Sequence, residues 1–124
     1  MKNQLNPIYI NSPSELDNLV RSFRTVDDFG VFLFLNDWDT VCLNLKRKLD
    51  GLKKFNGDRI IYVIDMFEIP NAIQIIRGAL QDINSKADVT KIYNYTGMPM
   101  LLKASYNLAM PLEYSNAIYQ ELGL

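Results

Sequence analysis

The chain has one cysteine, Cys42, and this residue is the best suited to nucleophilic chemistry. It ends the stretch Trp38-Asp39-Thr40-Val41-Cys42. A thiol in the first turn or so of a helix can have a lowered pKa, and its thiolate then forms mixed disulfides. The alternative is that Cys42 is a small buried residue, since free cysteine is among the most buried residue types. An internal disulfide is excluded, so nothing in the sequence requires an oxidising compartment.

Three carboxylates, Asp37, Asp65 and Glu68, are the other candidates for chemistry, as metal ligands or as acid catalysts. They follow apolar runs, where carboxylates ordinarily cap turns and helices, and no metal-ligand spacing recurs. Histidine is absent, which removes the commonest general base and, with one cysteine, any ordinary zinc site. We therefore expect no metal, no cofactor and no catalysis by these carboxylates.

Two short apolar runs must position these residues. Residues 31–35 end at Asn36 and residues 60–64 end at Asp65, as expected of strands buried on both faces of a sheet. Between them, Asp39 or Thr40 can cap a helix that Asn56-Gly57 ends. Its apolar stripe is Val41, Cys42, Leu45, Leu49 and Leu52. Strand, helix and strand then make one parallel crossover unit.

The remaining elements follow from local signals. Ser12-Pro13-Ser14-Glu15 is a capping box that opens a helix after an edge strand at 8–10. Pro70 can open a helix that runs to Ile83, and Asp88 can cap a second, short one. Two strands at 100–104 and 108–112 and a final helix at 113–122 complete the chain.

The order of these elements resembles the thioredoxin-like superfamily, and two motifs carry the resemblance. Asp39-Thr40-Val41-Cys42 stands where the family has Cys-x-x-Cys, and Gly97-Met98-Pro99 is similar to the loop with a cis proline that precedes a strand. The resemblance covers about residues 8–122. It implies an α/β three-layer sandwich with a mixed central sheet of four to five strands flanked by helices. We expect a single domain over 1–124, with an extended helical insertion at about 66–94 between the third strand and the cis proline.

The resemblance also bears on redox activity. In the family the first cysteine attacks the disulfide, and here Asp39 occupies that position and cannot attack. Cys42 matches the second, resolving cysteine, and Leu33 stands where classical thioredoxins have a buried acid. We therefore expect a redox-inactive protein-binding or structural module rather than an enzyme. The alternative is a single-cysteine thiol oxidoreductase or redox sensor that uses an accessible Cys42.

A shallow groove that binds extended segments is implied by the resemblance. Its residues here are Trp38, Met66, Phe67, Met98 and Pro99, with Asp39 either capping the helix or touching a ligand. The alternative for Met66 and Phe67 is that they fill the core. The helix after Pro70 has more apolar residues than one narrow stripe requires, so we expect Ile75 to point outward toward a partner or a second copy of the chain.

The composition limits which partners and which cellular location we expect for the protein. With 124 residues, of which 48% are hydrophobic, the chain can bury one core. A net charge of -1 gives no electrostatic footprint for nucleic acid or an anionic membrane. We see no signal peptide or transmembrane segment, so we expect a soluble protein, cytoplasmic or within a larger assembly, with another protein or its own copies as partner. Abundant Asn, Ile, Tyr and Lys are common in proteins from AT-rich genomes, including many bacteriophages, which suits an assembly subunit such as a virion protein.

Overall fold

The computed structural model describes residues 5–52, 57–92, 98–112 and 115–124. The elements in chain order are β1 (Leu5–Ile10), α1 (Pro13–Arg21), β2 (Phe29–Leu35), α2 (Thr40–Leu52), β3 (Arg59–Asp65), α3 (Ala72–Ile83), η2 (Thr90–Ile92), β4 (Met100–Ser105), β5 (Ala109–Leu112) and α4 (Ser115–Leu122). The described helices are all too short or too polar to cross a membrane.

The five strands form one mixed sheet in the order β1-β3-β2-β4-β5. β3 pairs in parallel with both β1 and β2, whereas β4 runs antiparallel to β2 and β5 antiparallel to β4. The carboxyl ends of β1, β2 and β3 therefore meet at one edge of the sheet. Because Phe34 pairs with Met100, β4 begins at that same edge, beside the end of β2.

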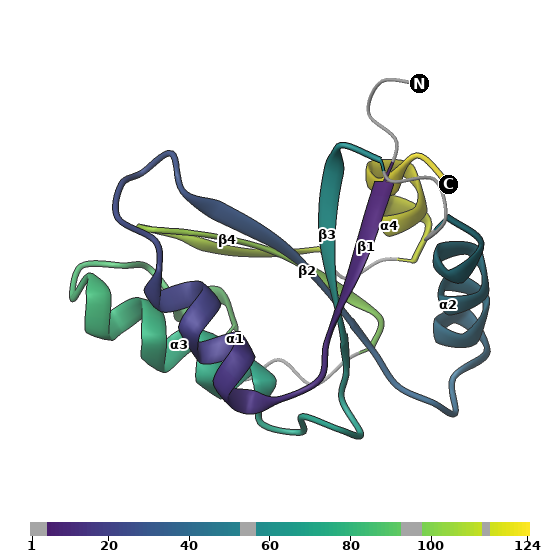
Figure 1. Ribbon diagram of the computed structural model, residues 1–124, viewed down its shortest axis with the longest axis horizontal. Coiled ribbons are helices and arrows are strands. Elements are labelled where there is room, and N and C mark those ends of the chain that lie inside the picture. Colours follow the sequence, from purple (N-terminus) through teal and green to yellow (C-terminus); the bar gives the residue numbers. More distant parts are fainter. Residues whose placement is uncertain (1–4, 53–56, 93–97, 113–114) are drawn as a thin grey trace.

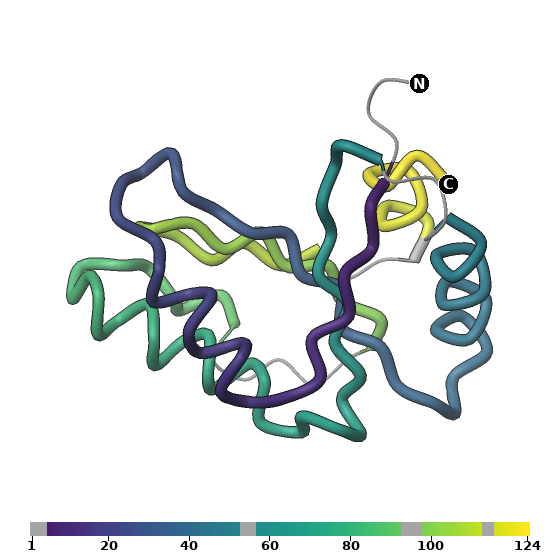
Figure 2. The backbone as a smooth tube through the Cα atoms, in the orientation of Figure 1, coloured from purple at the N-terminus to yellow at the C-terminus, as the bar shows by residue number. Residues whose placement is uncertain are grey.

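Helices cover both faces of the sheet, as Figures 1 and 2 show. α1 and α3 lie together on one face, and α2 and α4 lie on the other. A hydrophobic core lies on each face of the sheet, and the side chains of β2 alternate between the two. Phe32 and Phe34 face α1 and α3, while Leu33 and Leu35 face α2 and α4. The expected α/β three-layer sandwich with a mixed central sheet is confirmed, and the fold is thioredoxin-like.

The capping box at the start of α1 forms as predicted. The backbone N–H of Glu15 donates to Ser12 Oγ at 3.2 Å, and Pro13 opens the helix. The edge strand is longer than expected, because β1 begins at Leu5 rather than at Ile8 and pairs with β3 along its whole length.

The helical segment expected between the third strand and Pro99 is present, with different bounds. Pro70 lies in a turn, and α3 begins only at Ala72. The short helix after Asp88 is a single 3-10 turn, η2, in which the backbone N–H of Thr90 donates to Asp88 Oδ1 at 3.0 Å. The expected helix end at Asn56 and the expected loop residue Gly97 lie outside the described residues.

Candidate functional site

The turn between β2 and α2 is built around Asn36. This side chain is 9% exposed, and its Oδ1 accepts hydrogen bonds from the backbone N–H groups of Trp38 at 3.3 Å and Asp39 at 2.8 Å. Asp39 Oδ1 in turn accepts from the N–H of Val41 at 2.7 Å. Asp39 therefore caps α2 through Oδ1, as its position predicts.

The thiol of Cys42 is fully buried between α2 and the sheet. It is 0% exposed and belongs to the same core cluster as Leu33, Leu45 and Leu49. Burial raises the pKa of the Cys42 thiol, the charge of Asp39 acts in the same direction, and a hydrogen bond with the backbone of Asn36 opposes them. The net shift favours the neutral thiol, which is the opposite of what an activated thiolate requires.

Three segments meet beside this turn and enclose an apolar groove. Trp38 comes from the β2–α2 turn, Met66 from the turn after β3, and Met98 from the residues before β4. They line a hollow of about 380 Å³ together with Asn36, Pro70, Ile73 and Gln74. The peptide bond between Met98 and Pro99 is cis.

Exposure separates the expected groove residues into three groups. Trp38 is 74% exposed and Phe67 is 73% exposed, so neither fills the core. Met66 and Met98 are partly buried against core residues while still lining the groove. Pro99 is buried.

Phe67 lies next to the groove and does not line it. Its backbone N–H donates to Asp65 Oδ1 at 2.9 Å, which fixes the turn after β3.

The expectation that Ile75 points outward is wrong. Its side chain is partly buried and packs against the core cluster shared by α1, α3 and the sheet. α3 contacts both α1 and the sheet, and this double contact needs a wider apolar face than one narrow stripe.

Sequence reasoning did not place Asn36 or Gln74 in the site, and it assigned the helix after Pro70 to a separate surface. A signal exists for the second point, since Ile73 and Gln74 fall in the first turn of the helix expected after Pro70. No sequence pattern indicates that this turn closes the groove.

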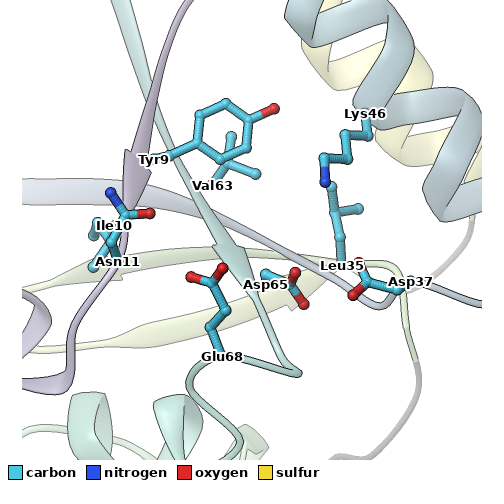
Figure 3. A pocket seen from close by; sticks show the side chains of 9 residues that line it. All are labelled: Tyr9, Ile10, Asn11, Leu35, Asp37, Lys46, Val63, Asp65 and Glu68. Atoms are coloured by element: carbon cyan, nitrogen blue, oxygen red, sulfur yellow. The ribbon is translucent and has the colours of Figure 1, made fainter.

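The three carboxylates line a second hollow, a cavity of about 60 Å³ at the carboxyl ends of β1, β2 and β3. Figure 3 shows Asp37, Asp65 and Glu68 around it, with Lys46 entering from α2. The other lining residues are Tyr9, Ile10, Asn11, Leu35 and Val63.

One wall of this cavity is fixed by Tyr9, which donates a hydrogen bond to Asp50 Oδ1 at 2.6 Å. Burial and this bond raise the pKa of the Tyr9 hydroxyl, so it remains a neutral donor. Within the part of the chain that the structure describes, no three acidic or cysteine side chains are grouped so as to hold a metal ion.

No protein-family model matches the chain, and no curated protein matches its sequence. Among solved structures, the chain is similar to a designed protein with assigned backbone chemical shifts, at 20% identity and a TM-score of 0.53 over 97% of this chain and 88% of that one. It is also similar to a mutant thioredoxin from Halobacterium salinarum NRC-1, at 17% identity and a TM-score of 0.49 over 94% of this chain and 88% of that one. At identities this low the likeness concerns the fold alone. The strand order and the two helical layers identify that fold as thioredoxin-like.

Proposed function

We propose that this protein is a redox-inactive protein-binding module with a thioredoxin-like fold. One observation carries the proposal: the thiol is 0% exposed while the neighbouring Trp38 is 74% exposed. Thiol exchange needs a reachable thiolate, whereas binding needs an accessible apolar surface. The exposures favour binding at this site.

The chemistry of the turn supports the same conclusion. Asp39 stands at the helix start, where its carboxylate caps α2 and cannot attack a disulfide. Cys42 is the only cysteine of the chain, so a mixed disulfide would have no internal thiol to resolve it. The raised pKa of Cys42 weighs against the single-cysteine alternative as well.

The groove has the features of a binding surface. Tryptophan is the residue type most enriched among binding hot spots, and methionines adapt their shape to different apolar side chains. In our proposal, an extended partner segment lies across the groove and buries an apolar side chain against Trp38 and Met98. The role is the same whether the partner is a separate protein or another subunit of a larger assembly.

The test is a selection of displayed random peptides on the immobilised protein, followed by affinity measurements with the enriched peptides. Trp38→Ala should weaken their binding by about tenfold or more, as expected for a hot-spot residue. Phe29→Ala is the matched control, because Phe29 is an exposed aromatic residue at the opposite end of β2. This variant should bind the enriched peptides as tightly as the wild type does. Failure to enrich any peptide that depends on Trp38 would refute the proposal.

A further inference from the structure

The side-chain amide of Asn36 has a donor that the protein does not use. Its Oδ1 accepts from the backbone N–H groups of Trp38 and Asp39, and these two donors fix which end of the amide is the oxygen. The other end, Nδ2, has no acceptor among the described residues. Asn36 is nevertheless only 9% exposed, so this donor lies on a residue that is almost wholly withdrawn from water.

The open side of Nδ2 faces the apolar groove. In the described part of the chain, no side-chain polar atom is both fully buried and without a partner, so Nδ2 keeps some contact with the outside. Asn36 lines the groove, and the contact is made there. The groove therefore contains an unpaired N–H donor supplied by one of its most buried residues.

Burial orders the lining residues of the groove from floor to rim. Asn36 and Ile73 are buried and form the floor. Met66 and Met98 are half-buried and form the walls. The exposed rim consists of Trp38, Pro70 and Gln74. A side chain that enters the groove passes apolar walls before it reaches the amide at the floor.

An occupant without an oxygen atom would cover this donor at a cost. A polar group that loses its water and gains no partner weakens the complex, whereas an occupant whose oxygen reaches Nδ2 replaces the water with a hydrogen bond. The groove therefore favours a side chain with an apolar body and an acceptor at its tip.

Charge complementarity selects an uncharged oxygen over a carboxylate. Residues 36–45 and 65–76, which supply most of the groove lining, contain four carboxylates and no lysine or arginine. These negative charges repel a carboxylate on the partner. Tyrosine meets both requirements, because it carries an uncharged phenol oxygen on an aromatic ring. Sites for small organic molecules begin at about 300 Å³, so a hollow of about 380 Å³ has room for one such ring.

We propose that the partner segment is anchored in the groove by a tyrosine side chain, whose ring lies between Trp38 and Met98 and whose hydroxyl oxygen accepts a hydrogen bond from Asn36 Nδ2. This inference rests on the proposed function and names the residue that the groove recognises. The methionines suit the ring, since thioether sulfurs make favourable contacts with aromatic rings. The hydroxyl proton bonds to a water in the groove. Phenylalanine has the same ring without the oxygen, so Asn36 discriminates between the two.

The test starts from the peptides enriched on the wild-type protein. Tyrosine should recur at one fixed position of the Trp38-dependent peptides. A synthetic copy of the most enriched peptide is then compared with a copy that carries phenylalanine at this position. The phenylalanine copy should bind about three to ten times more weakly, as expected for the loss of one neutral hydrogen bond.

A protein variant assigns this preference to Asn36. In Asn36→Ala, once circular dichroism shows that it is folded, the two copies should bind with equal affinity. Asn71→Ala is the matched control, because Asn71 is an exposed amide next to Pro70 that neither lines the groove nor caps α3 through its side chain. The tyrosine preference of this control should equal that of the wild type.

NMR of the wild-type protein detects the same hydrogen bond without any change to the turn. The side-chain NH₂ protons of Asn36 should shift downfield when the tyrosine copy binds, and they should shift less with the phenylalanine copy. This comparison decides the question if Asn36→Ala does not fold.

Three results would overturn the inference and leave the proposed function standing. The first is a set of Trp38-dependent peptides without a recurrent tyrosine. The second is a tyrosine preference that is the same in the wild type and in folded Asn36→Ala. The third is an equal shift of the Asn36 NH₂ protons in the two complexes. Absence of any Trp38-dependent peptide would instead overturn the proposed function, and this inference with it.

Discussion

The side chain of Asn36 accepts a hydrogen bond from the backbone N–H of Asp39 at 2.8 Å and so ties the end of β2 to the start of α2. The same oxygen accepts from the N–H of Trp38 at 3.3 Å. One nearly buried amide therefore holds the backbone that presents the exposed tryptophan and the capping aspartate. The position of the groove depends on this turn as much as on the sheet below it.

Asn36→Ala should destabilise the protein by about 1–3 kcal/mol, because the two N–H groups lose their acceptor in a partly buried turn. Urea unfolding measures the free-energy change. Asn44→Ala is the control, since Asn44 is exposed on α2 and its loss should change stability by less than about 0.5 kcal/mol. Equal stabilities for the two variants would contradict the role of Asn36.

Leu45→Ala should cost about 2–5 kcal/mol, because Leu45 is 0% exposed in the core between α2 and the sheet. Leu43→Ala removes the same atoms from a residue on the same helix that is 36% exposed. Its cost should be clearly smaller, since less apolar surface is exposed to water by the change. Chemical denaturation of both variants tests which face of α2 packs against the sheet. A larger loss of stability in Leu43→Ala than in Leu45→Ala would mean that the opposite face of the helix is buried.

Gly30→Ala should destabilise the protein, because a Cβ at Gly30 would lie 2.8 Å from the ring of Phe32. That ring is fully buried and stacks on Tyr62 with centroids 5.4 Å apart, so it has no room to move. Gly78→Ala is the matched substitution in open space on α3, and it should stabilise the helix by about 0.5–1 kcal/mol. The midpoint temperature of thermal unfolding should fall in Gly30→Ala and rise in Gly78→Ala. A rise in both variants would argue against the packing around Phe32.

The fold was predictable because its signals are local. The apolar runs that became β2 and β3, the helical stripe at Leu45 and Leu49, and the cap at Asp39 all lie within a few residues of the features that encode them. The order of elements then restricted the architecture, since short connections and parallel crossovers leave few arrangements.

The site was only partly predictable because its walls come from distant parts of the chain. Trp38, Met66 and Met98 were brought together as the resemblance implied. The contribution of Gln74 and the gathering of Asp37, Asp65 and Glu68 depend on β1, β2 and β3 ending at one edge, which no local pattern encodes. The error at Ile75 has a similar origin, because periodicity does not reveal that α3 packs against both α1 and the sheet.

Cys42 should resist alkylation by iodoacetamide in the native protein and react readily in urea, because its thiol is 0% exposed. Its pKa is raised in the folded state, so the unfolded chain ionises first as pH rises. The stability that the neutral thiol contributes is therefore present at neutral pH and declines as pH passes the ordinary thiol value of about 8.5. Cys42→Ala should lack this part of the alkaline decline. Fast native labelling near neutral pH would instead support the single-cysteine oxidoreductase.

The most direct measurement is the affinity of one Trp38-dependent peptide for the wild type, for Cys42→Ala and for Trp38→Ala. If the groove binds the peptide without thiol chemistry, Cys42→Ala should keep the wild-type affinity for it, because the thiol does not line the groove. The affinity of Trp38→Ala for the peptide should be lower by about tenfold or more. Loss of binding in Cys42→Ala, together with a covalent peptide adduct on the wild-type thiol, would contradict a redox-inactive binding module.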